Sequence, residues 1–172
     1  RGMPIEGAYV DQDGNGIIDQ YDRVFHHSKH PKVTMTFGSQ FRYKSWDLGF
    51  SLRASLGNYV YNNIESSNGS YSRMFTYGLH NLVKTDYYFE QSQSMSDYYL
   101  HNASFLRCDN ITLGYTWDNL LNDNLRLRLF GGVQNPFVIT KYNGIDPEVA
   151  SGVENTPYPK ATTYSLGVVA TF

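Results

Sequence analysis

The chain has 172 residues, of which 16% are aromatic and only 17% charged, and its formal net charge is −2. This charged fraction lies well below the roughly 25% of ordinary soluble domains, and the 15 tyrosines and 15 glycines favour strands and turns over helices. The near-neutral charge provides no basic surface for nucleic acid, and the single cysteine, Cys108, excludes an internal disulfide framework.

The segment 1–32 contains an oxygen-rich loop with the spacing of an EF-hand calcium site. Its candidate ligands are the side-chain oxygens of Asp11, Asp13, Asn15, Asp19 and Asp22 and the backbone carbonyl of Ile17. Gly16 permits the sharp turn in the middle of such a loop. The last ligand is aspartate where an EF-hand has glutamate, which predicts a modest affinity. The sequence therefore predicts a calcium loop, with an acidic turn rich in glycine and asparagine as the alternative.

The segment 33–56 alternates as two strands joined by a short turn at 44–45. Apolar residues occupy most odd positions from Val33 to Tyr43 and the even positions from Trp46 to Leu56. Because side chains of a strand alternate between its faces, each strand has one apolar and one polar face. Aromatic residues gather beside the turn. The sequence predicts a tight β-hairpin here.

The segment 57–103 is long and rich in tyrosine and asparagine. The residues concerned are Tyr59, Tyr61, Asn62, Asn63, Tyr71, Tyr77, Tyr87, Tyr88, Tyr98 and Tyr99. Such side chains stack on sugars or peptides and hydrogen-bond to them, and they also form protein interfaces. We therefore expect a long connection that contacts a ligand or a partner protein, with both alternatives open and the substrate-binding residues unknown. The chain has no nucleophile motif, which predicts that it is not an enzyme.

A second hairpin is predicted over 104–135. Apolar residues alternate from Ile111 to Trp117, and again at 125, 127 and 129. Upstream, Arg107 and Asp109 fall on the apolar positions, which indicates a β-bulge or a departure from the apolar layer. Residues 136–160 are expected to form another long connection. The alternation returns in a terminal strand, 161–172, whose apolar positions run from Tyr164 to Phe172.

The polar faces of these strands carry charges that a protein core rarely accepts unpaired. They are Arg42, Asp47, Arg53, Arg126 and Arg128, together with Gln134. Short connections at 44–45 and 118–123 alternate with long ones at 57–103 and 136–160, as short periplasmic turns and long outer loops do in outer-membrane barrels. The sequence therefore predicts an all-β, antiparallel transmembrane β-barrel. The alternative is a soluble, calcium-stabilised β-sandwich at the cell surface that binds carbohydrate, because a sandwich also has sheets with one wet face.

About five strands cannot close a membrane barrel, since the smallest have about eight. An open sheet in lipid would leave backbone groups unpaired. We therefore expect the chain to be the C-terminal part of a larger barrel, and the start at Arg1 without an initiator methionine fits a processed or longer protein. Strand directions counted back from a periplasmic C-terminus place 1–32, 57–103 and 136–160 outside the cell.

Several motifs follow one another in the order seen in a known family. They occupy 11–19, 102–107, 110–115, 134–137, 140–142, 144–148 and 158–172. Together they resemble the C-terminal end of the SusC/RagA family of TonB-dependent outer-membrane transporters. The resemblance implies the last five or so strands of a barrel of about 22 strands with a plugged lumen, without the plug domain and TonB box.

The resemblance also implies the partners and the location. The expected partners are a SusD-like lipoprotein, the TonB complex through the missing N-terminal part, an oligosaccharide or peptide substrate, and the lipid of the bacterial outer membrane. The terminal strand resembles the assembly signal read by the outer-membrane insertion machinery. The signal residues are Ser165, Gly167, Ala170 and Phe172.

Overall fold

The computed structural model describes residues 5–76, 89–120, 125–155 and 158–172. The chain divides into two compact units, which are described separately. The first combines Arg1–His30, Asn58–Ala103 and Tyr142–Tyr158, and the second combines Pro31–Gly57, Ser104–Lys141 and Pro159–Phe172. Among the described residues, no helix is long and apolar enough to cross a membrane.

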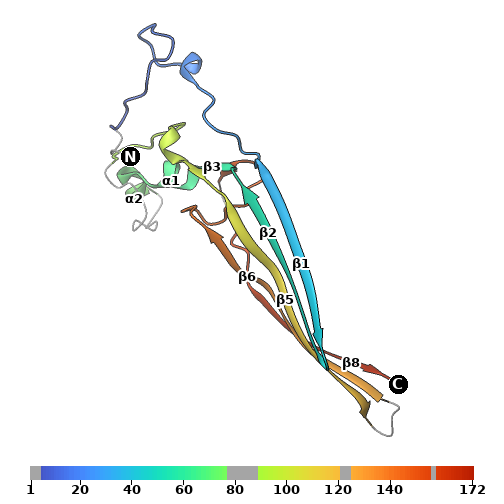
Figure 1. Ribbon diagram of the computed structural model, residues 1–172. Coiled ribbons are helices and arrows are strands. Elements are labelled where there is room, and N and C mark those ends of the chain that lie inside the picture. Colours follow the sequence, from blue (N-terminus) through green and yellow to red (C-terminus); the bar gives the residue numbers. More distant parts are fainter. Residues whose placement is uncertain (1–4, 77–88, 121–124, 156–157) are drawn as a thin grey trace. The chain divides into compact units, whose positions relative to one another are not determined.

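The second unit is a five-stranded antiparallel sheet (Figure 1) with the order β1-β2-β5-β6-β8. Its strands are β1 (Val33–Tyr43), β2 (Trp46–Leu56), β5 (Phe105–Leu120), β6 (Leu125–Thr140) and β8 (Thr163–Thr171). β1 and β2 coincide with the two alternating runs of the sequence, and Lys44 takes a positive φ of 54° in the turn between them. The sheet is open at β1 and β8, as expected of a segment of a larger barrel.

A β-bulge in β5 explains the break in its alternation. Ser51 pairs with Asn110 and Leu52 with Cys108, so Asp109 is an extra residue opposite β2. Because of this extra residue, the side chains that precede it in β5 lie on the opposite faces of the sheet from those that the alternation of 111–117 predicts. Arg107 consequently pairs with Arg53 on the polar face instead of lying on the apolar one. The bulge predicted from the sequence is confirmed.

β6 continues to Thr140, five residues beyond the predicted hairpin end at 135. The expected start of a loop at 136 was wrong for 136–140. Asn135 and Pro136 lie opposite the bulged Asp109, because pairing passes from Asn110–Gln134 to Cys108–Phe137. Asn135 has a positive φ of 49°. A bulge tolerates proline because no ladder hydrogen bond is required of its nitrogen there, and the strand therefore resumes after Pro136.

The first unit contains a small three-stranded sheet that the sequence did not reveal. Its order is β4 (Leu100–Asn102), β3 (Tyr59–Asn62) and β7 (Val153–Glu154), and β3 runs antiparallel to β4 and parallel to β7. Two short helices follow β3, α1 (Asn63–Asn68) and α2 (Tyr71–Thr76), and the 3-10 turns are η1 (Gln20–Asp22) and η3 (Asp97–Tyr99). The Asn62 side chain accepts a hydrogen bond of 3.0 Å from the Glu65 N–H and caps α1.

The core of this unit joins residues from distant parts of the chain. Val60, Ala103 and Tyr142 are buried against one another, with Val149 packed on them. The segment 57–103, expected as a long connection, is therefore folded through much of its described part.

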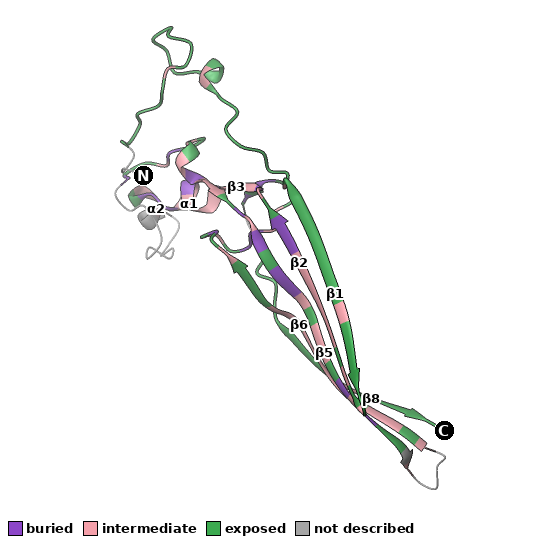
Figure 2. Cartoon of the chain, viewed as in Figure 1, coloured by how far each residue is buried: buried purple, intermediate pink, exposed green. Residues whose placement is uncertain are grey.

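Buried residues also occur in β2 and β5 of the sheet unit, whereas β1 and β8 are almost wholly exposed (Figure 2).

The N-terminal segment contacts the segment 58–103 of the same unit at two places. The Glu6 carboxylate accepts hydrogen bonds from the Glu90 and Gln91 N–H groups at 3.0 and 2.8 Å. Further along, the His27 ring stacks on Tyr59 with 3.8 Å between ring centroids. The residues between these two attachments include the acidic loop.

Candidate functional site

The acidic loop brings together three of its six predicted ligands. Carboxylate oxygens of Asp11, Asp13 and Asp22 lie within 4.8 Å of one another at the surface. Among the described residues this is the group whose carboxylate spacing could hold a metal ion. Gly14 and Gly16 have positive φ values of 76° and 81°, the backbone geometry that lets such a loop turn back on itself. The arrangement suits a hard cation that prefers oxygen ligands.

The predicted ligands, inside and outside this cluster, accept hydrogen bonds from the backbone of the loop. Asp19 accepts a 2.7 Å hydrogen bond from the Tyr21 N–H and caps η1, and the Asn15 side chain accepts one of 2.7 Å from the Ile17 N–H. Both oxygens of Asp22 accept backbone hydrogen bonds, from Gln12 and Asp19, each at 2.7 Å. These donors, Asp19 first, lower the pKa of Asp22 below its usual range. The carboxylate of Asp22 therefore stays ionised, as a metal ligand must.

A buried carboxylate, which the sequence gave no reason to single out, organises the segment 142–154. Glu154 is 1% exposed and accepts hydrogen bonds from the Tyr142 hydroxyl at 2.7 Å and the Ile145 N–H at 2.8 Å. Burial, helped by the hydrogen bond to Glu154, raises the pKa of Tyr142 well above its usual range, so its hydroxyl remains a donor. A side chain at Gly144 would collide with Glu154 and Tyr142. This network fixes the loop and contains no catalytic group.

The predicted aromatic residues of 57–103 divide into several environments. Tyr99 is buried, and the Tyr61 hydroxyl hydrogen-bonds to Ser66 and accepts from the Met95 N–H at 3.0 Å. Both therefore hold the first unit together. Tyr71 is exposed. Tyr77, Tyr87 and Tyr88 lie outside the described residues.

One face of the five-stranded sheet is apolar and exposed. Its exposed members include Phe37, Phe41, Leu48, Leu113, Leu129, Leu166 and Val168. At the turn end of the sheet this face carries a row of rings, with centroids 4.8 Å apart between Trp46 and Tyr115 and 4.6 Å apart between Tyr115 and Trp117. A contiguous apolar surface of this kind is unfavourable in water and suits an apolar surrounding.

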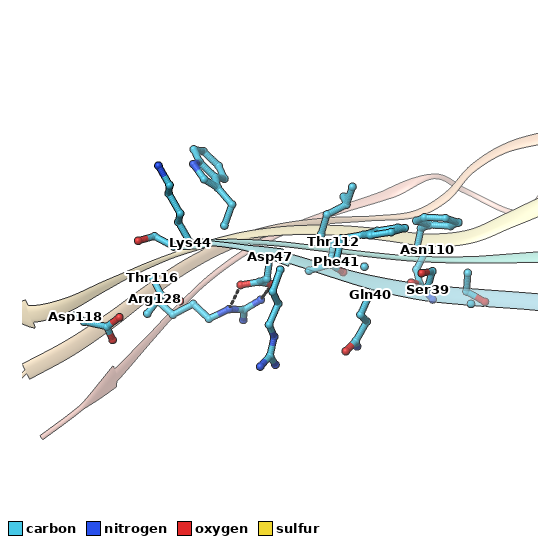
Figure 3. A pocket seen from close by; sticks show the side chains of 18 of the residues that line it. Ser39, Gln40, Phe41, Lys44, Asp47, Asn110, Thr112, Thr116, Asp118 and Arg128 are labelled. Atoms are coloured by element: carbon cyan, nitrogen blue, oxygen red, sulfur yellow. Dashed lines mark hydrogen bonds and ion pairs between the residues drawn. The ribbon is translucent and has the colours of Figure 1, made fainter.

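The opposite face is polar, and three of its arginines are paired with aspartates. Arg53 binds Asp109 at 3.1 Å, so the bulge in β5 directs Asp109 toward the arginine that the sequence left without a partner. Arg126 binds Asp118 at 2.9 Å. Arg128 binds both carboxylate oxygens of Asp47, with Nε 2.9 Å from Oδ1. Figure 3 shows this last pair in a polar hollow of about 890 Å³ on the sheet.

Gly114 makes the pair between Asp47 and Arg128 possible. The two residues stand on β2 and β6, which β5 separates. A Cβ atom at Gly114 would lie 2.6 Å from both the Arg128 guanidinium and the Asp47 carboxylate. Because glycine has no side chain, Arg128 can cross β5 and reach Asp47.

The predicted assembly-signal residues lie on both faces of β8 and at its end. Ser165 and Gly167 pair with Gly132 and Phe130 of β6, and Ser165 donates a 3.3 Å hydrogen bond to the Gly132 carbonyl. Ala170 pairs with Leu127 on the apolar face. Phe172 follows the strand and is 97% exposed.

Comparison with known proteins identifies the family. No family model matches the chain. The whole chain is 44% identical to the TonB-dependent receptor SusC of Bacteroides thetaiotaomicron over 182 aligned positions, which cover 18% of that protein. The chain belongs to the SusC/RagA family. It is also 26% identical to the TonB-dependent receptor P3 of Formosa agariphila over 93% of its length. The chain spans 18% of the length of both of these relatives.

Solved structures agree with this membership. The RagAB peptide transporter superposes with a TM-score of 0.69 and 26% identity, over 84% of this chain and 17% of that one. The RagAB peptide importer in its closed-closed state superposes with a TM-score of 0.71 and 24% identity, over 96% of this chain and 20% of that one. The second likeness shows the fold alone.

Membership of the SusC/RagA family indicates what surrounds each face of the sheet. Its members are outer-membrane proteins, so the chain is an outer-membrane protein and its antiparallel sheet is a segment of a transmembrane barrel. In such barrels the apolar side chains face lipid and the polar ones face the lumen. The family assignment inferred from the sequence motifs is confirmed. Asp109, Gly114 and Glu154 are the structurally important residues that sequence reasoning missed, although the break in alternation at 105–110 pointed to the first.

Proposed function

We propose that this chain forms the terminal strands of an energy-coupled outer-membrane transporter that imports glycans or peptides together with a SusD-like surface lipoprotein. The observation that carries the proposal is the 44% identity to SusC along the whole chain, on a sheet with one apolar and one polar face. Energy would come through TonB, as the names of both curated relatives indicate. Within this function the chain forms part of the barrel wall and three connections on the outer side, and it catalyses no reaction.

The function can be tested with a chimera. In SusC of Bacteroides thetaiotaomicron, this chain would replace the matching 18% of the protein, in a strain that lacks its own SusC. We expect the chimera to enter the outer membrane and to restore uptake that stops when TonB is deleted. A surface lipoprotein should co-purify with it in detergent. Insertion without uptake would contradict the transport role, and a protein that is soluble without detergent would favour the sandwich alternative.

We propose in addition that the acidic loop binds calcium. The support is the cluster of Asp11, Asp13 and Asp22 within 4.8 Å and the oxygen-only composition of the candidate ligands. Asn15, Asp19 and the Ile17 carbonyl would complete the coordination once the Asn15 and Asp19 side chains exchange their backbone hydrogen bonds for the cation. Calcium would then stiffen the segment between the two attachments of the N-terminal residues.

Calcium should raise the melting temperature of the first unit in the complete transporter, because a ligand that binds only the native state stabilises it by mass action. Asp11→Asn should abolish this shift. Asp118→Asn, which removes an exposed carboxylate of the sheet unit outside the loop, should leave it intact. The measurement is thermal unfolding followed by proteolysis of 5–30, with calcium and then with chelator. Equal melting temperatures in both solutions would leave the acidic-turn interpretation.

A further inference from the structure

An aromatic ring on the polar face of the sheet lies over a glycine of the terminal strand. Phe130 of β6 and Gly167 of β8 are direct cross-strand partners. A Cβ atom built on Gly167 would collide with the Cζ atom of Phe130 and would lie 2.7 Å from its Cε1 atom. No side chain fits there without displacing the ring, since real Cβ atoms essentially never make contacts shorter than 3.0 Å. Because Gly167 has no side chain, the tip of the Phe130 ring occupies the space beside it.

The ring of Phe130 also contacts the side chain of Arg128. The Arg128 guanidinium lies 4.8 Å from the centroid of the Phe130 ring, within cation–π range. Arg128 is in turn fixed by its two hydrogen bonds to Asp47, which pass over Gly114. Asp47, Arg128, Phe130 and Gly167 thus form a chain of contacts from β2 to β8, and both glycines on its path provide the space that it needs.

This arrangement distinguishes the observed strand register from its neighbours. A slip of β8 by one residue would exchange its apolar and polar faces, which the pattern of side chains already opposes. A slip by two residues keeps the faces, and it would place Ser165 or Val169 opposite Phe130 in place of Gly167. Either side chain would occupy the space of the ring. The hydrophobic pattern alone does not exclude this second kind of slip.

We propose that Gly167 acts in assembly through Phe130, as the position that fixes the register of the terminal strand on β6. The proposal rests on the assignment of the chain to a transmembrane barrel. It goes beyond a simpler account, in which the insertion machinery recognises each signal residue of the terminal strand separately. In that simpler account Gly167 is recognised by a partner. In our proposal, glycine is required at position 167 because of a contact within the barrel, and this requirement disappears when the Phe130 ring is removed.

The test is a double-mutant cycle in the complete transporter, scored by the amount of folded barrel in the outer membrane. Gly167→Ala alone should lower that amount several-fold, because overpacking at a fixed contact destabilises and abundance follows stability. Phe130→Leu, which removes the ring tip and keeps an apolar side chain, should make Gly167→Ala nearly harmless. Gly131→Ala is the matched control on β6, since its Cβ would make only a 3.8 Å contact and should leave the amount unchanged.

Register can be read directly as a second measurement. Gln134 and Thr163 are cross-strand partners, and cysteines placed there should be joined by a short bifunctional reagent in the parent barrel and less efficiently in Gly167→Ala. Loss of barrel in Gly167→Ala that Phe130→Leu does not relieve would overturn the proposal and favour recognition of Gly167 by a partner. No loss in Gly167→Ala would overturn it as well. Failure of the barrel assignment would show differently, as a parent protein that never reaches the membrane.

Discussion

Replacing Leu52 with arginine should destabilise the inserted barrel by about 2–4 kcal/mol, the cost of an arginine on the lipid face near the middle of the bilayer. Leu52 pairs with Phe37 on the apolar face of β2, six residues beyond Trp46 at the turn end. A barrel strand crosses the membrane in about 10 residues, so this position lies near the midplane. The measurement is urea unfolding of the complete barrel in lipid vesicles.

The neighbouring residue provides the control for this prediction. Ser51 faces the polar side, where it pairs with Asn110, and Ser51→Arg should change the free energy of unfolding only slightly. Its new guanidinium would stand among other polar groups in the lumen. Equal costs for Leu52→Arg and Ser51→Arg would contradict the assignment of lipid and lumen to the two faces.

Deleting Phe172 should sharply lower the amount of transporter in the outer membrane while leaving the molecules that do insert nearly as stable as before. Phe172 is 97% exposed and lies beyond the last residue of β8, so its loss removes little packing. Until the barrel closes, β8 presents unpaired backbone groups to a partner strand, and a terminal ring anchors at the membrane interface. The predicted effect is therefore on recognition and insertion.

Two substitutions separate this role from a small packing defect. Phe172→Trp keeps an interfacial ring and should preserve the membrane level, whereas Phe172→Ala should behave like the deletion. Quantitative immunoblots of outer-membrane fractions measure the level, and the unfolding temperature of the inserted protein measures stability. A normal level after deletion would show that Phe172 merely ends an apolar stripe.

The sheet could be predicted closely because its signal is local. Alternation with a period of two marks β1, β2 and β8 directly, and the charged residues that violated it in β5 located a real bulge. The end of β6 was missed because Pro136 usually ends a strand, and only the bulge opposite it allows the strand to continue. The small sheet of the first unit was missed for another reason. Its strands have two to four residues, too few for any periodicity.

The candidate metal site was predicted in its composition and only partly in its geometry. Spacing identified Asp11, Asp13 and Asp22, which the structure brings together. Spacing could not show that Asp19 and Asn15 form local hydrogen bonds with nearby N–H groups. Short polar side chains do this readily in turns, where they compete with any external ligand. The number of ligands that a cation would gain therefore depends on the cost of exchanging those bonds.

The first unit is built from three separate segments of the chain, and this limits how it can be exchanged between proteins. Its three segments alternate with strands of the sheet, and their contacts join distant positions, such as the 2.8 Å hydrogen bond between Asn63 and Asn155. β7 completes a sheet whose other strands belong to the segment before it. A graft of one segment into another transporter would therefore leave Asn63 or β3 without its partner. To transfer this unit to another transporter, an engineer would have to move all three segments together.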